Sequence, residues 1–276
     1  MAGTLYLVGT PIGNLSDFSP RAVEALSACD FIAAEDTRVT LRLLNHFGVK
    51  KPLVSYYEQN KRQRGEQICA RLLAGENGVL VSDAGMPAIS DPGEDLVRLC
   101  AENGVEVRAI PGCCAAVNAL AVSGLPTGRF TFEGFLTVNK KSRREHLNSL
   151  KDETRTMIFH EAPHKLRTTL NDLTEAFGPD RRISLCRELT KLHEEVLRFT
   201  LAEAVAYYEE NAPKGEYVLV VAGAAPKTGA VVTLEDGVAQ VLALKEQGMR
   251  LKDAAKEVAE HTGLSKNELY AAALER

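Results

Sequence analysis

The segment Leu7-Val8-Gly9-Thr10-Pro11-Ile12-Gly13-Asn14-Leu15 decides the fold, because an apolar strand runs directly into a glycine-rich turn there. Two later segments, Val81–Gly93 and Ala109–Val117, repeat this step from an apolar run into a turn of small residues. Ligands of α/β domains bind outside the carboxyl ends of parallel strands. The turns after these runs are therefore candidates for ligand binding.

Seven apolar runs have the length of strands, and most are continuous rather than alternating. Continuous runs predict strands that are buried on both faces of a mainly parallel sheet, with helices between them. Asp91–Glu94 and Thr200–Glu203 have the pattern of capping boxes that open two of these helices. The predicted strands are Thr4–Val8, Asp30–Ala34, Gly78–Ser82, Val105–Ile110, Thr156–His160, Arg182–Cys186 and Tyr217–Ala222.

The chain has 276 residues, which is enough for two domains of ordinary size. Gly124-Leu125-Pro126-Thr127-Gly128 has the composition of a joint, and Ala224–Ala230, with Pro226 and Gly229, has that of a second linker. The last segment contains helical patterns only. We therefore predict an N-terminal α/β domain at 1–123, a C-terminal α/β domain at 129–224 and a helical tail at 233–276.

The composition indicates a soluble globular protein, with 45% hydrophobic and 25% charged residues. No apolar run approaches the roughly 18 residues of a membrane-spanning helix, and the first residues lack the basic region of a signal peptide. Six cysteines without a Cys-x-x-Cys pair indicate free thiols in a reducing compartment rather than disulfides or a zinc site. We therefore expect a cytoplasmic protein without a membrane partner. The net charge of −4 means that a nucleic-acid partner needs a local basic patch.

Each glycine-rich turn has a structural alternative to ligand binding. In the first turn, Pro11 stands where a dinucleotide fingerprint needs its second glycine, and proline lacks the N–H that binds pyrophosphate. A tight structural turn is the alternative there. Around Asp83 the run of small residues and prolines is longer than a helix start needs, which favours a site. The turn at Ala109–Val117 is equally compatible with close packing against another helix.

Charged side chains follow three other predicted strands. Ala34–Arg38 brings two carboxylates and a guanidinium to the edge that carries the first turn, although Asp36 or Thr37 can simply cap the next helix. His160–His164 and Arg187–Lys191 have the acids and bases that position an acceptor or take its proton, and surface salt bridges are the alternative. The histidines do not have the spacing of a metal site, so no metal is expected.

Two further segments are candidates for contact with nucleic acid. Four basic residues and one acidic residue lie in Asn139–His146, and such a run either neutralises phosphates or forms a solvated helix face. In the tail, Leu251–Ala259 and Ser265–Tyr270, joined through His261–Leu264, resemble a helix-turn-helix pair. They predict contact with nucleic acid, or else a small helical module that packs on itself or on a partner subunit.

Taken in order, these motifs resemble the tetrapyrrole methylase family of S-adenosylmethionine-dependent methyltransferases over about residues 3–223. The turns at Leu7–Leu15, Asp83–Gly93 and Pro111-Gly112 match its three N-terminal landmarks. The resemblance implies two α/β domains with a cleft between them for S-adenosylmethionine. It also implies a methyl transfer that needs no metal, and subunits that pair as homodimers.

The second half of the chain resembles one branch of this family. Phe132–Leu136, His160–His164 and Arg187–Lys191 are similar to the members that methylate 16S ribosomal RNA of the small subunit. This implies 2′-O-methylation of a cytidine ribose in the decoding region, in free RNA or in the assembled 30S particle. Tetrapyrrole-modifying members usually have Gly-Pro-Gly in the first turn, whereas this chain has Thr10-Pro11-Ile12-Gly13. A methyltransferase that acts on a tetrapyrrole, and a nucleic-acid-binding regulator that senses S-adenosylmethionine, are the two alternatives.

The resemblance also implies site residues. Those that contact the methyl donor are Pro11, Asp83, Ala84, Gly85, Ile89, Ser90, Ala115 and Ala116, and those that close the pocket from the second domain are Phe135, Glu161, Ala222 and Gly223. From residue type and predicted strand-end position, Glu188 is the first candidate for the base that accepts the ribose proton. Lys191 and Arg187 would orient phosphate or lower the proton affinity of the hydroxyl, and Arg38 and Asp36 are second candidates. The residues expected to contact the RNA backbone are Lys140, Lys141, Arg143 and Arg144.

Overall fold

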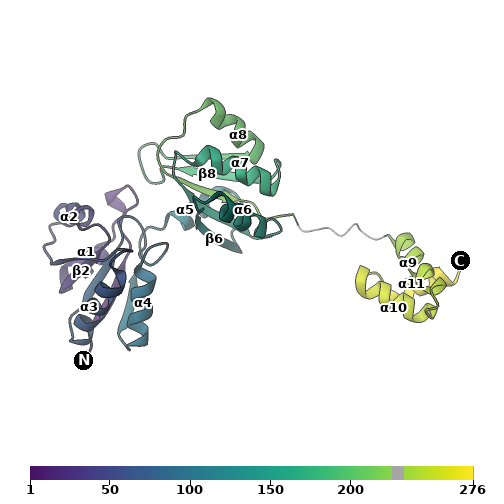
Figure 1. Ribbon diagram of the computed structural model, residues 1–276, viewed down its shortest axis with the longest axis horizontal. Coiled ribbons are helices and arrows are strands. Elements are labelled where there is room, and N and C mark those ends of the chain that lie inside the picture. Colours follow the sequence, from purple (N-terminus) through teal and green to yellow (C-terminus); the bar gives the residue numbers. More distant parts are fainter. Residues whose placement is uncertain (226–232, 276) are drawn as a thin grey trace. The chain divides into compact units, whose positions relative to one another are not determined.

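The computed structural model describes residues 1–225 and 233–275. The chain divides into two compact units, Met1–Ala224 and Ala225–Arg276 (Figure 1). The predicted second linker lies outside the described residues from Pro226 onward, Gly229 included. Among the described residues, no helix combines the length and the apolar character needed to cross a membrane.

A five-stranded sheet forms the centre of the N-terminal half. Its strands are β1 (Thr4–Val8), β2 (Phe31–Ala34), β3 (Leu53–Ser55), β4 (Gly78–Val81) and β5 (Glu106–Ile110). They pair in the order β3-β2-β4-β1-β5, and every pairing is parallel, as predicted for this half. The turns after β1, β4 and β5 therefore emerge at the same edge of the sheet.

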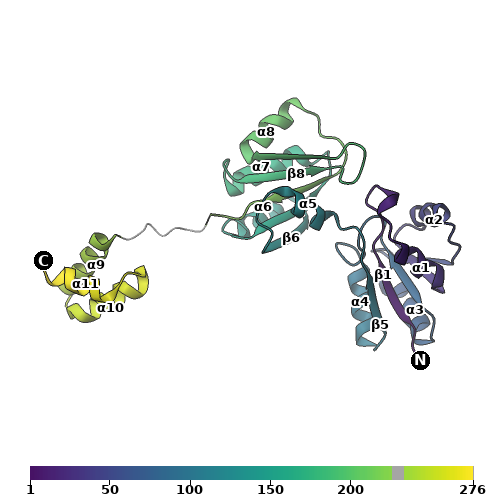
Figure 2. The ribbon, with the colours of Figure 1, turned by 180° about the vertical axis from the view of Figure 1, so that it is seen from behind.

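Four helices cover the two faces of this sheet. They are α1 (Pro20–Ala28), α2 (Thr37–His46), α3 (Lys61–Leu73) and α4 (Gly93–Glu102), and a short 3-10 turn, η1 (Leu15–Asp17), follows β1. The first two bury Leu26 and Leu44 against one face, and the other two bury Leu72 and Leu96 against the opposite face. All four helices are labelled in Figure 2. The continuous apolar strands are thus explained by burial on both sides.

The second sheet corrects the expectation of mainly parallel strands. It consists of β6 (Phe130–Phe135), β7 (Thr156–Glu161), β8 (Arg182–Arg187), β9 (Glu195–Thr200) and β10 (Tyr217–Val221), in the order β6-β7-β10-β8-β9. Only β6 and β7 are parallel, because β10 runs antiparallel to both β7 and β8, and β8 and β9 are antiparallel neighbours. A continuous apolar run indicates that a strand is buried on both faces of its sheet, but it does not indicate whether the strand is parallel or antiparallel to its neighbours.

Helices also cover both faces of the second sheet. One face carries α6 (Lys140–Ser149), α7 (Leu166–Phe177) and α8 (Leu201–Glu210), and α5 (Ala115–Ser123) lies on the other face. The N-terminal domain was predicted to extend to residue 123 and so to include α5, yet this helix packs against β7, β8, β9 and β10. The division between the two α/β cores therefore precedes α5, and Gly124, with a φ of 76°, ends the helix at the predicted joint.

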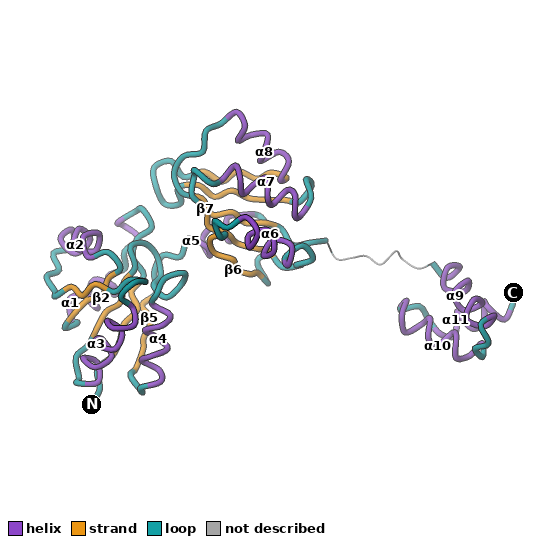
Figure 3. The backbone as a smooth tube through the Cα atoms, viewed as in Figure 1, coloured by secondary structure: helices purple, strands orange, loops and turns teal. Residues whose placement is uncertain are grey.

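The second unit contains three helices in its described part, α9 (Leu234–Glu246), α10 (Leu251–Thr262) and α11 (Lys266–Leu274) (Figure 3). They bury Val241, Ala255 and Leu269 in a small core of their own. Gly263 ends α10 in the left-handed conformation, and the Ser265 side chain accepts the Glu268 N–H at the start of α11.

Candidate active site

The three glycine-rich turns meet at the edge of the first sheet. The Thr10 N–H donates to the Gly85 carbonyl at 2.9 Å, and the Gly85 N–H donates to the Thr10 carbonyl at 3.1 Å. The backbones of Gly9 and Gly112 are also in contact, since a Cβ built on Gly112 would lie 2.6 Å from the Gly9 carbonyl oxygen. Glycine is therefore required where the first and third turns cross, and all three turns lie together at one edge of the sheet.

The loop after β4 holds its shape through Asp91. Ala88 and Ser90 both have positive φ angles, of 67° and 68°, which non-glycine residues adopt at a cost. The Asp91 carboxylate accepts the Ala88 N–H at 2.9 Å and the Gly93 N–H at 2.7 Å. The predicted capping box was wrong, because Pro92 occupies the cap position without a side-chain bond and Asp91 clamps the loop instead. This clamp leaves Ile89 exposed in the loop.

Carboxylates gather at the same edge. The Asp36 N–H donates to Asp83 Oδ1 at 3.0 Å, which joins the end of β2 to the loop after β4. Asp36 itself caps α2 by accepting the Arg38 N–H, which confirms the capping alternative. Hydrogen bonds from the Arg38 side chain and backbone lower the pKa of Asp36 to about 2. Burial and the neighbouring Asp83 charge raise the pKa of Glu35.

The second α/β core contributes residues to this edge. A Cβ on Gly13 would lie 2.4 Å from Cγ of Lys191, so the lysine stem covers the first turn. A Cβ on Gly134 would lie 3.6 Å from the Ser90 hydroxyl, so the end of β6 faces the loop after β4. The site is therefore built from the turns of the first sheet and from the edge of the second sheet where β6, β7 and β8 end.

Lys191 is held by two carboxylates. Its Nζ lies 2.8 Å from Glu188 Oε1 and 2.6 Å from Glu216 Oε2, and Glu188 Oε1 also accepts the Glu216 N–H at 2.9 Å. The hydrogen bond from Lys191 lowers the pKa of Glu188. Burial lowers the pKa of Lys191, but the hydrogen bonds to both carboxylates outweigh burial and raise it. A carboxylate with a lowered pKa is a weak proton acceptor, so the geometry favours Glu188 as a positioning residue for Lys191.

Glu188 and Thr190 carry backbone strain, with φ angles of 52° and 67°. A Cβ on Gly215 would lie 2.5 Å from Glu188 Cγ, so Gly215 makes room for the carboxylate. Gly215 and Glu216 were not among the predicted site residues, although they stand directly before a predicted strand. Arg187, in contrast, pairs with Glu195 across the β8–β9 ladder at 3.2 Å.

An aromatic cluster lies at the same end of the second sheet. The His160 ring packs edge-on against Phe132 and Phe135, with ring centroids 5.3 Å apart in both pairs. Burial lowers the pKa of His160, so the ring is neutral at neutral pH, and its Nε2 makes no hydrogen bond within the described part of the chain. Phe135 is 61% exposed and presents an apolar surface at the end of β6.

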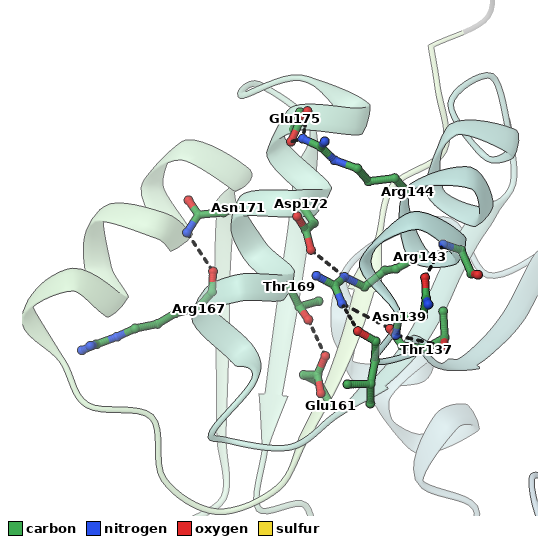
Figure 4. A network of polar contacts seen from close by, with 12 residues as sticks. Thr137, Asn139, Arg143, Arg144, Glu161, Arg167, Thr169, Asn171, Asp172 and Glu175 are labelled. Atoms are coloured by element: carbon green, nitrogen blue, oxygen red, sulfur yellow. Dashed lines mark hydrogen bonds and ion pairs between the residues drawn. The ribbon is translucent and has the colours of Figure 1, made fainter.

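Three predicted donor residues differ from the expectation, because Ala222 and Gly223 lie away from this edge and Glu161, which ends β7 at the edge, turns its side chain into the core. Tyr217 pairs with Glu161, and Val221 pairs with Met157, so β10 ends at the opposite edge of the sheet. Ala222 and Gly223 follow Val221 and therefore lie far along the sheet from the first turn. Glu161 is only 5% exposed, and its carboxylate accepts the Thr169 hydroxyl inside the core (Figure 4).

The basic run on α6 is partly internal. Arg143 Nε lies 2.6 Å from Asp172 Oδ2, and the side chains of this pair are 12% and 10% exposed. Arg144 pairs with Glu175, so α6 is tied to α7 through both arginines (Figure 4). Lys141 is 86% exposed, and Lys140 is exposed as well. Two of the four predicted RNA-contacting residues thus hold helices together.

The arrangement of turns and the order of both sheets define a class of protein. Residues 4–205 match the family model described as Tetrapyrrole (Corrin/Porphyrin) Methylases, and residues 232–276 match one described as RsmI C-terminal HTH domain. The chain belongs to the tetrapyrrole methylase family and is a methyltransferase.

Relatives narrow this class further. The chain is 48% identical over 273 residues to a protein of Synechocystis sp. named Ribosomal RNA small subunit methyltransferase I, covering 99% of this chain and 98% of the relative. It is 45% identical to the protein of the same name from Escherichia coli O157:H7, covering 99% and 96%. The resemblance to this branch is confirmed.

Solved structures agree on the fold. Uroporphyrin-III-C-methyltransferase from Thermus thermophilus aligns with a TM-score of 0.56 at 20% identity, covering 80% of this chain and 94% of that chain. Diphthine synthase aligns with a TM-score of 0.61 at 16% identity, covering 80% and 90%.

Proposed function

We propose that this chain transfers a methyl group from S-adenosylmethionine to the ribose 2′-hydroxyl of a cytidine in the decoding region of small-subunit ribosomal RNA. The observation that carries the proposal is 45–48% identity, over nearly the whole length, to proteins named for ribosomal RNA methylation. The fold by itself does not select the acceptor, because the matched structures are named for a porphyrin and for diphthine.

The turns fit a donor of this kind. Gly9, Gly85 and Gly112 bring bare backbone to one place, which allows close approach of a ligand. A solved structure of the same fold, at 18% identity and a TM-score of 0.52, is titled as a complex with S-adenosylhomocysteine. The bound donor supplies an already activated methyl group. The chain's own residues hold the acceptor oxygen in line, and positioning of that kind supplies about 7–11 kcal/mol at most.

Lys191 is the residue proposed to orient the acceptor. Its stem covers Gly13, and Glu188 and Glu216 fix its ammonium group at the mouth of the first turn. Lys191→Met keeps the apolar stem and removes the charge. We expect kcat to fall more than about tenfold with an unchanged dissociation constant for the donor, because one charged contact to the acceptor is worth about 1.5–3 kcal/mol.

The variant Glu188→Gln distinguishes between two roles of Glu188, which are to position Lys191 and to act as the base that accepts the ribose proton. A positioning residue predicts a smaller loss than Lys191→Met and an unshifted pH profile of kcat. A loss as deep as that of Lys191→Met, together with disappearance of the acidic limb of the profile, would assign the proton to Glu188.

RNA contacts are proposed for the exposed lysines of α6 and for the tail. Lys140→Ala and Lys141→Ala should each lower the salt slope of RNA binding by about 0.7, as expected for one phosphate contact to a single strand. Removing residues 233–276 should weaken binding without abolishing it. If the shortened chain no longer binds RNA at all and its turnover no longer depends on RNA, the result would favour the alternative of a nucleic-acid-binding regulator that senses S-adenosylmethionine.

The proposal includes a cytoplasmic homodimer, on the resemblance stated above. The outer face of α5 supports pairing, because Val117 and Val122 are 52% and 40% exposed on this helix. Light scattering coupled to size exclusion should give about twice the subunit mass of 30.0 kDa. A mass equal to one subunit at all concentrations would reject the dimer.

The target is tested with small subunits that lack the modification. They are incubated with the protein and labelled S-adenosylmethionine, and the RNA is digested to nucleosides. We expect label in 2′-O-methylcytidine from the decoding region. Label in a base, or in another region of the RNA, would reject this target while leaving methylation of RNA intact.

A further inference from the structure

A cavity of about 370 Å³ lies beside the proposed donor turns, between the first turn and α2. Its size falls within the range of small-ligand sites, about 300–1,000 Å³. It shares Pro11 and Asp83 with the predicted donor residues. Four further lining residues, Thr10, Gly13, Leu15 and Ser82, lie in the first two glycine-rich turns. The remaining ones come from α2 and were not among the predicted site residues, and they are Val39, Thr40, Arg42, Leu43 and His46.

The cavity combines an apolar wall with a cation. Leu15, Val39 and Leu43 provide the apolar wall, and Arg42 and His46 stand one turn apart on α2. Within the part of the chain that the structure describes, the Arg42 guanidinium makes no hydrogen bond or ion pair. An arginine without an internal partner beside an apolar wall is suited to a flat ring that carries one phosphate.

We infer that this cavity receives the acceptor nucleotide of the RNA, with its base against Val39 and Leu43 and its phosphate at Arg42. This inference rests on the proposed function. The carboxylates of Glu35, Asp36 and Asp83 lie at the same edge, so a ligand with many carboxylates would be repelled there. A nucleotide brings a single negative charge, whereas a tetrapyrrole precursor brings several.

Two variants of α2 form a matched test. Val39 and Leu41 are both exposed apolar residues, at 38% and 49%, but only Val39 lines the cavity. Val39→Glu sets a carboxylate in the wall that is proposed to contact the base, and Leu41→Glu makes the same change outside the cavity. Arg42→Ala removes the cation. All three are compared with the wild type in thermal unfolding, in S-adenosylmethionine binding, and in methyl transfer to small subunits and to a tetrapyrrole precursor.

We expect Val39→Glu and Arg42→Ala to raise KM for small subunits about tenfold or more, with donor binding unchanged. The salt slope of RNA binding by Arg42→Ala should also fall by about 0.7 to 1. Leu41→Glu should stay within about twofold of the wild type.

Three results would overturn the inference. If the wild type methylates RNA and Val39→Glu behaves like Leu41→Glu, the cavity does not hold the acceptor and the proposed function stands. If Val39→Glu weakens donor binding as much as it raises KM, the cavity belongs to the donor. If the wild type labels only the tetrapyrrole precursor, the proposed function fails and the nucleotide assignment fails with it.

Discussion

Replacing Gly112 with alanine tests whether contact between the first and third turns builds the donor site. The added Cβ would lie 2.6 Å from the carbonyl oxygen of Gly9 and 2.7 Å from its Cα. Both are backbone atoms, which cannot rotate away as a side chain does. Because ordinary contacts begin near 3.4 Å, the two turns must separate by about 0.8 Å. Thr10, which bonds to Gly85, is the next residue along and would move with Gly9.

The magnitude follows from this displacement. Inserting one carbon into a packed site costs about 1–3 kcal/mol of folding free energy. A shift of about 1 Å in a positioning site costs on the order of a hundredfold in rate. We therefore expect a lower Tm by several degrees, weaker S-adenosylmethionine binding by at least about tenfold, and a larger loss of kcat/KM.

Gly128→Ala is the matched control, because a Cβ on Gly128 meets no atom within 4 Å among the described residues and its φ is ordinary. Calorimetric titration with S-adenosylmethionine and thermal unfolding of both variants give the comparison. If Gly112→Ala binds the donor as tightly as Gly128→Ala does, the crossing of the two turns plays no part in donor binding and the reasoning is refuted.

Three other predictions follow from single contacts. Arg143→Ala leaves the buried Asp172 carboxylate without its partner, so urea unfolding should show a free energy of unfolding that is lower by about 3–5 kcal/mol. The control Lys141→Ala should change this free energy by less than about 0.5 kcal/mol. Equal effects of the two variants would contradict a structural role for the pair. Asp91→Ala removes the acceptor of two loop N–H groups, so donor affinity should fall about tenfold with a small change in Tm, and an unchanged affinity would show that the loop holds its shape without the clamp. Burial raises the pKa of the Cys100 thiol from 9.0 to about 12, so the thiol ionises first in the unfolded chain, and the free energy of unfolding should fall as pH rises from about 9 to 12. In denaturant titrations at several pH values, Cys100→Ala should reduce this dependence of the free energy of unfolding on pH. The same dependence in the variant and the wild type would show that the Cys100 thiol does not cause it.

The parts of the fold that follow from local pattern were predictable. β1 and β4 are apolar runs that end in glycine-rich turns, and β5 ends in a third such turn although Glu106 and Arg108 interrupt its apolar pattern. The shared edge of the three turns follows from parallel pairing. β6 was missed because its register shifts between Phe132 and Gly134, which breaks the strand pattern. The second sheet was misjudged in direction, since burial on both faces produces the same sequence pattern in parallel and antiparallel strands.

The direction of β10 also bears on the expected donor residues. Ala222 and Gly223 were expected to close the donor pocket because of the resemblance to the family, and the reversal of β10 puts them at the other edge of the second sheet. Residue type alone also did not reveal which charged side chains form ion pairs with each other. From the sequence, Arg143 was predicted to contact phosphate. Its partner Asp172 is 29 residues away in the chain, and only the fold brings the two side chains together.

The central claim is that RNA is the acceptor, and a competition for the methyl group tests it most directly. Intact small subunits without the modification, their extracted RNA and a tetrapyrrole precursor are offered together to the protein with radiolabelled S-adenosylmethionine. The account predicts label in RNA, as 2′-O-methylcytidine, and none in the tetrapyrrole. Label in the tetrapyrrole alone would contradict it and would leave only the fold and the methyltransferase class standing.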